Sequence, residues 1–207
     1  MKKLDLTKRY KSYYTAGSNP GILHVEAAQY LSIQGKGDPS GEGYAARLQA
    51  LYAAAYALKF ACKARDFDFT VAKLEGLWKF DEAAYGHITM EEAPRKIPRS
   101  EWEYRMLTRL PDEVSETEIT QAIDEAFRKK GNPEIREVEL YRMTEGKVVQ
   151  MLHHGPFDRE PETLARMQEF IQAHGFQKNG DHHEIYLSDF RKTPPEKLKT
   201  ILREPVK

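Results

Sequence analysis

The sequence predicts an α+β protein in which one antiparallel sheet carries two long helices on one face. Segments with strand alternation and segments with helical spacing follow one another in the order strand, helix, strand, strand. This order occurs twice, in residues 26–131 and 135–207, and Ala46–Gln49 in the first unit resembles Ala165–Gln168 in the second. A duplicated unit explains both observations. We therefore expect a central ligand cleft along the pseudo-two-fold seam where the halves meet.

The first unit begins with a short strand at 29–34, which leads through a turn-rich loop into an Ala-rich helix at about 42–65. Its apolar stripe keeps helical spacing and consists of Tyr44, Leu48, Leu51, Ala55, Leu58 and Cys62. Residues 67–80 and 100–110 read as strands because polar and apolar side chains alternate along them. The segment between them, 81–99, mixes glycine, proline and charge, and it is predicted to be a loop.

The connection between the two units contains a helix and a predicted hairpin. Ser115-Glu-Thr-Glu118 is a capping box that opens a helix to about residue 130. Residues 135–143 and 147–154 are expected to pair as a hairpin around Glu145-Gly146.

The second unit continues with a helix at about 160–174, which ends at Gly175, a residue typical of helix C-termini. A strand at 182–188 follows. Thr193, followed by prolines and by Glu196 three residues on, is predicted to open a last helix.

Composition and charge exclude several classes of protein. With 32 basic and 32 acidic residues, the chain lacks the basic footprint of a direct nucleic-acid binder. Its only cysteine is Cys62, so an intrachain disulfide is impossible, as suits a reducing compartment. No apolar run has the length needed to span a bilayer, and the amino terminus lacks the apolar region of a signal peptide. We expect a cytoplasmic protein without a membrane partner, in which residues 1–25 form a surface extension and 26–207 form the domain.

Glu184 is the first candidate for a functional residue. Strand alternation places it on the same face as Tyr186, with Ile185 and Leu187 on the opposite face. A carboxyl group on an interior strand face costs free energy unless a hydrogen bond, a cation or a ligand compensates it. Such a group is a candidate general acid or base.

Aromatic residues are expected to share the helix-facing side of the sheet with Glu184. Trp102 and Tyr104 lie on one face of their strand, and Tyr52 or Tyr56 approaches from the long helix. Aromatic rings around one carboxylate suit a flat, lipophilic or cationic ligand. We therefore select Glu184, Tyr186, Trp102, Tyr104 and Tyr56 as ligand-binding residues, with Glu184 also as the catalytic candidate. The alternative is that Glu184 pairs with an Arg or Lys on a solvated face while the aromatic residues fill the core.

Two pairs of adjacent histidines, His153-His154 and His182-His183, suggest a metal site. Neighbouring residues on a strand point to opposite faces, so neither pair can chelate a metal by itself. His153 or His182 could still line the cleft. We expect no metal site and no cofactor, because glycine-rich phosphate loops and nucleophile elbows are also missing from the sequence.

Several segments resemble the GyrI-like small-molecule-binding family. The most specific are Glu184–Arg191 together with Glu196–Arg203, which resemble the family's carboxy-terminal signature. Gly146–Asp158 is similar to its second-repeat strand and turn, and Leu77–Phe80 and Trp102–Tyr104 are similar to its first-half strands. The resemblance covers roughly residues 26–205.

The resemblance implies the duplicated fold and places Glu184 at the family's central binding-site glutamate. Phe190 departs from the proline expected there, which affects only the turn. Relatives hold lipophilic aromatic cations, and some stand-alone members hydrolyse the strained cyclopropane of alkylating natural products. Such chemistry here would use Glu184 with Trp102 or Tyr104. A small-molecule binder, with or without this hydrolase activity, is the leading interpretation. A gyrase-inhibitor type of interaction module and an effector domain acting with a separate DNA-binding partner are the alternatives, and oligomeric state is left open.

Overall fold

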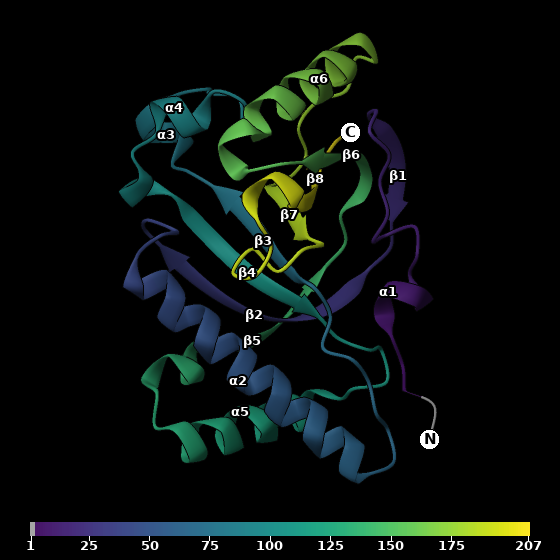
Figure 1. Cartoon of the computed structure of the whole chain (residues 1–207), viewed down its shortest axis with the longest axis vertical. Coiled ribbons are helices and arrows are strands. Elements are labelled where there is room, and N and C mark those ends of the chain that lie inside the picture. The colour runs from purple at the N-terminus through teal and green to yellow at the C-terminus, as the bar shows by residue number, and fades with distance from the viewer. Residues whose placement is uncertain (1–2) are drawn as a thin grey trace.

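Eight antiparallel strands form one sheet in the computed structural model, which describes residues 3–207 (Figure 1). The order of strands across the sheet is β1-β6-β8-β7-β3-β4-β2-β5. Their bounds are β1 Gly21–Val25, β2 Ala28–Lys36, β3 Leu74–Lys79, β4 Glu103–Arg109, β5 Glu139–Met143, β6 Gly146–His154, β7 His182–Tyr186 and β8 Lys199–Pro205.

The sheet is built from a duplicated strand-helix-strand-strand unit, as the sequence predicts. The first unit consists of β2, α2, β3 and β4, and the second of β6, α6, β7 and β8. Strand β3 pairs with β7 at the centre, and outward from this seam the order is β4 then β2 on one side and β8 then β6 on the other. The predicted α+β fold class is therefore confirmed.

Three helices account for most of the helical residues. The bounds are α2 Glu42–Ala64, α5 Glu116–Lys130 and α6 Glu160–Ala173. The α2 stripe is buried as predicted, and α5 packs alongside α2 (Figure 1). The Ser115 capping box is formed in both directions, and Gly175 has φ +67° after α6, a conformation that favours glycine. Helices α2 and α6 cover different halves of the sheet and leave β7 between them (Figure 1).

The segment predicted as a loop, 81–99, contains two short helices, α3 (Glu82–Tyr85) and α4 (Ala93–Lys96). Asp81 caps α3 by accepting hydrogen bonds from the backbone of the next residues. Ala93 and Ile97 are buried against Phe80. This packing fixes the segment over one end of the sheet.

Two predictions about the second half are wrong. The hairpin does not form, because β5 pairs with β2 and β6 pairs with β1 and β8, at opposite ends of the sheet. The helix at Thr193 is one 3₁₀ turn, Pro195–Lys197, followed by β8. Strand β8 is buried on both faces between β6 and β7. Its backbone N–H and C=O groups form hydrogen bonds with two neighbouring strands. These hydrogen bonds and the burial of its side chains outweigh the local helix propensity of the sequence.

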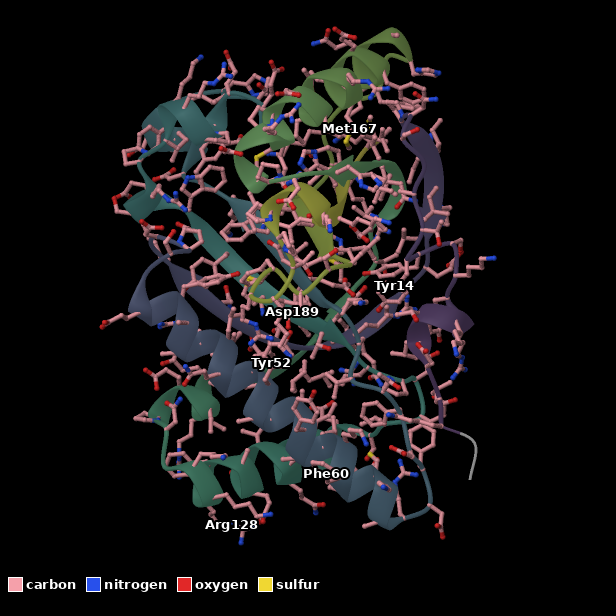
Figure 2. The ribbon with its side chains drawn as sticks, in the orientation of Figure 1. Tyr14, Tyr52, Phe60, Arg128, Met167 and Asp189 are labelled. Carbon is pink, nitrogen blue, oxygen red and sulfur yellow. The ribbon has the colours of Figure 1, made fainter. Side chains whose placement is uncertain are left out.

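The amino-terminal segment covers the face of the sheet that α2 and α6 leave open. It contains α1 (Leu6–Arg9) and β1, and its side chains Leu6, Tyr13 and Tyr14 pack against Val148, Ile185 and Ile201. Figure 2 shows Tyr14 between α1 and the sheet. Residues 1 and 2 of the predicted extension lie outside the described residues, and the predicted domain boundary at residue 25 stays a prediction.

Candidate functional site

The floor of the candidate site is formed by the central strands β3 and β7. Alternation along β7 places His182, Glu184 and Tyr186 on the helix-bearing face and His183 and Ile185 on the other. The Tyr186 hydroxyl donates a hydrogen bond of 2.6 Å to Glu184 Oε2. It accepts one of 3.0 Å from the indole nitrogen of Trp78 on β3. This series of hydrogen bonds, from Trp78 through Tyr186 to Glu184, fixes the Glu184 carboxylate from one side.

A cavity of about 660 Å³ lies above this floor, a volume typical of small-molecule sites. Its walls come from four separate parts of the chain. These are the start of α2 with its preceding loop (Pro39, Ser40, Tyr44), the insert with α4 (Met90, Pro94, Arg95, Arg99, Trp102), the start of α6 (Phe157, Asp158, Glu160, Pro161, Leu164) and Phe190 after β7.

Aromatic rings form most of the apolar wall. Tyr44 stacks on Trp78 with ring centroids 6.2 Å apart. Trp102 meets Trp78 edge-on at 6.2 Å. Phe157 contacts both Tyr186 and Phe190 at 5.9 Å. Such a wall offers ring faces and edges to a flat ligand.

His182 lies between two carboxylates. Its Nδ1 is 2.6 Å from Glu204 Oε1 on the neighbouring strand β8. Its Nε2 is 3.4 Å from Glu184 Oε1, which is within ion-pair distance but without hydrogen-bond alignment. Burial opposes the imidazolium form, yet Glu204 and Glu184 outweigh that cost and raise the pKa of His182 to about 10. His182 is therefore positively charged at neutral pH.

Glu160, the first residue of α6, is a second carboxyl group in the cavity wall. Its side chain is buried, and among residues 3–207 no hydrogen-bond partner reaches its Oε1. Burial and the nearby Glu184 carboxylate raise the pKa of Glu160 well above its ordinary value, although His182 acts in the opposite direction. Glu160 therefore keeps its proton to a higher pH than an ordinary carboxyl group does.

The sequence-predicted residues are only partly brought together. Glu184, Tyr186 and Trp102 line the cavity. Tyr104 is buried behind this wall, against Tyr44 and Trp78.

Tyr56 is not among the lining residues. Its ring is 48% exposed on α2, next to Phe60, which Figure 2 shows farther along this helix from β7. The α2 stripe that includes Leu48 and Leu51 faces the sheet, so Tyr56 is turned outward.

The sequence analysis did not select Trp78, Tyr44 or Glu160 as residues of the site. Strand alternation could have indicated Trp78, because Gly76 and Trp78 lie two residues apart and so share a face of β3. The missing side chain at Gly76 leaves space for the Trp78 indole. Glu160 gave no such signal, because an acid in the first turn of a helix is usually solvated and stabilised by the helix dipole.

The alternative interpretation of Glu184 is not what the structure shows. Its partners are Tyr186 and His182, rather than an Arg or Lys on a solvated face. The histidine pairs are split as expected, with His182 in the cavity and His183 on the opposite face. His153 is bound to Thr163 and to the Pro156 carbonyl oxygen. Within residues 3–207, no three His, Cys, Asp or Glu side chains gather as metal ligands.

The sequence model of the GyrI-like small molecule binding domain matches residues 18–207. The chain belongs to the GyrI-like family. This membership makes the chain a small-molecule-binding domain and agrees with a cavity that its duplicated units enclose. Within residues 3–207, no helix combines the length and apolarity that crossing a bilayer requires.

Three solved structures similar to this GyrI-like chain come from Listeria innocua. An uncharacterized conserved protein is 38% identical, with a TM-score of 0.88 over 99% of this chain and 100% of that chain. A structure named as a hydrolase is 37% identical, with a TM-score of 0.84 over 99% and 100% of the two chains. A second hydrolase structure is 37% identical, with a TM-score of 0.86 over 100% of both. No curated protein matches the chain.

Proposed function

We propose that the chain binds planar hydrophobic and cationic small molecules in the cavity over β3 and β7. The observation that carries this proposal is the Glu184 carboxylate, held by Tyr186 at the floor of an aromatic cavity. With His182 charged between Glu184 and Glu204, these three groups carry one net negative charge. A flat cation compensates that charge and stacks on Trp78 or Trp102.

We also propose that bound substrates with a strained ring are hydrolysed, as in opening of a cyclopropane conjugated to a carbonyl group. Glu184 takes a proton from water as the water oxygen bonds to the ring methylene carbon. The ring carbon–carbon bond breaks, its electron pair moves to the conjugated carbonyl oxygen, that oxygen takes up a proton, and Glu184 returns its own proton to solvent. The net reaction is addition of one water molecule. The 37% identity to two structures named as hydrolases supports turnover, and the dry aromatic wall limits competing reactions.

Binding is tested by fluorescence titration with two ligands of nearly the same shape. N-methylacridinium is a flat permanent cation, and N-methylacridone is flat, neutral and carries a carbonyl group. Glu184→Gln is expected to weaken binding of the cation about tenfold or more, which corresponds to ~1.4 kcal/mol, and to affect the neutral ligand far less. Glu169→Gln, an exposed acid on α6, is the matched control. Equal losses for both ligands would show that Glu184 is structural.

Turnover is tested on the same samples with a cyclopropane-bearing alkylator, and products are read by mass spectrometry. Ring-opened product that gains the mass of water and depends on Glu184 supports the hydrolase. Binding of the dye without any product above background leaves a protein that binds its ligands and does not convert them.

A further inference from the structure

Glu160 is a buried acid for which the proposed binding and hydrolysis assign no role. It lines the same cavity as Glu184, is 8% exposed, and its Oε1 has no hydrogen-bond partner among residues 3–207. A buried polar atom without a partner costs free energy. Oε1 itself is closed off from solvent, but the Glu160 side chain borders a ligand-sized cavity, so a bound molecule can meet the part of it that remains exposed.

Five other charged or titratable groups with ionic side chains line the cavity with Glu160. They are Glu184 and His182 on β7, Asp158 just before α6, and Arg95 and Arg99 on the insert across the cavity. Glu184 disfavours a second negative charge at Glu160, and His182 favours it. However, His182 is already shared between Glu184 and Glu204. In the free protein, burial and Glu184 therefore outweigh His182, and the raised pKa of Glu160 favours its neutral form.

We propose that Glu160 adapts the cavity to the charge of its ligand, by donating a hydrogen bond to a neutral carbonyl compound and by giving up its proton when a cation binds. The inference rests on the proposed binding function and specifies its ligand class. One protonatable acid lets the same aromatic wall accept flat cations and flat neutral ketones or enones.

The physical basis is the low dielectric of the enclosed site. A cation within the cavity interacts strongly with an adjacent carboxylate, so it favours the ionised form of Glu160 over the protonated one. A neutral ligand with a carbonyl oxygen has the opposite preference, because only the protonated acid has a hydrogen to donate. The two ligand types therefore stabilise different protonation states of one side chain.

The affinities should consequently depend on pH with opposite signs. Burial holds the pKa of free Glu160 above its ordinary value, so binding of a cation includes the cost of releasing the proton at lower pH. Affinity for N-methylacridinium is expected to rise with pH, by at most about tenfold per pH unit for one proton. Affinity for N-methylacridone is expected to fall once free Glu160 begins to ionise.

Proton release is measured directly by isothermal titration calorimetry of the full chain at pH 7, in phosphate and in Tris. The two buffers differ in ionisation enthalpy, so the difference in observed heat gives the number of protons released. We expect net proton release for N-methylacridinium and none for N-methylacridone. Glu160→Gln keeps a hydrogen-bond donor but cannot ionise. It should abolish proton release, weaken binding of the cation and leave binding of the neutral ligand unchanged. Glu169→Gln on the same helix should behave as wild type.

The possible failures are distinguishable. If the cation binds in a Glu184-dependent manner but releases no proton, or if Glu160→Gln releases as many protons as wild type, Glu160 does not adapt and this inference is wrong while the binding function stands. If neither acridine binds the wild-type chain, the binding function fails and the inference fails with it. Should Glu160→Gln not fold, proton release by the wild-type chain with the two ligands still decides.

Discussion

Gly76 of β3 lies directly opposite Glu184 of β7, at the seam where the two repeats pair. The missing side chain at 76 leaves space that its neighbours use. A Cβ atom at this position would lie 2.8 Å from Trp78 Nε1 and 3.2 Å from the Tyr186 hydroxyl. The Trp78–Tyr186–Glu184 hydrogen-bond chain therefore depends on glycine at this place in the sheet.

Gly76→Ala is expected to lower both stability and ligand affinity. The added methyl group must displace Trp78 or Tyr186, and overpacking of this kind costs about 1–3 kcal/mol. Urea unfolding and N-methylacridinium titration measure the two effects. Gly21→Ala is the matched control, since nothing lies within 4 Å of a Cβ atom there in β1. Equal behaviour of the two variants would mean that the site tolerates the methyl group.

Tyr186→Phe removes the hydroxyl that joins Trp78 to Glu184. The indole nitrogen loses its acceptor and the carboxylate loses its donor, so we expect a loss of about 1–3 kcal/mol in the free energy of unfolding. Cation affinity should also fall, because Glu184 is no longer held in place. Thermal unfolding and dye titration provide the measurements. Tyr56→Phe, on a 48% exposed ring, should change neither quantity, and a similar loss there would contradict the assignment.

The charge on His182 should make the protein less stable in alkali. The pKa of His182 is raised to about 10 in the folded chain, from an ordinary value of 6.5. Its contribution is therefore fully present below about pH 6.5 and is lost as pH rises through about 10. We expect the free energy of unfolding to fall between these values by on the order of a few kcal/mol.

His182→Gln should flatten this dependence in chemical unfolding measured from pH 6 to 10. His24→Gln serves as the control, because the His24 side chain is 65% exposed. A wild-type profile without slope in this range would rule out a charged His182.

The opposite face of the sheet contains a separate buried network. His183 Nδ1 is 2.9 Å from Glu145 Oε1, and Arg203 donates a 3.0 Å hydrogen bond to Glu145 Oε2. Burial opposes the charge of Glu145, but His183 and Arg203 outweigh it and lower the pKa of Glu145 to about 2. The amino-terminal segment closes this network, because Arg203 also donates to the Tyr13 carbonyl oxygen.

Glu145→Gln is expected to destabilise the fold by about 3–5 kcal/mol, since the buried Arg203 guanidinium loses its paired carboxylate and His183 retains only Glu75. In the wild type this contribution is present above about pH 4.5 and is lost as pH falls through about 2. Ligand affinity of the folded variant should be unchanged, because the network lies on the other face. Chemical unfolding and dye titration separate the two effects. Glu139→Gln, whose side chain is 51% exposed beside Arg105, should cost less than about 1 kcal/mol.

Local patterns in the sequence determined much of the fold and the centre of the site. The capping box at Ser115, the buried stripe of α2 and the alternation of β7 are all short-range features, and each predicted its element. Alternation has a period of two residues wherever a strand lies. It was therefore sufficient to place Glu184 with Tyr186 and to separate His182 from His183.

Tertiary structure alone decided which segments meet. The Pro-rich start at 194 carries a helix signal, yet β8 forms because the sheet has an open position between β6 and β7. Glu160 has the sequence context of a solvated helix start, and it becomes a buried acid only when α6 packs on β6 and β8, beside β7. Burial and strand pairing depend on contacts with segments that are distant in the sequence, so no short stretch of sequence can predict them.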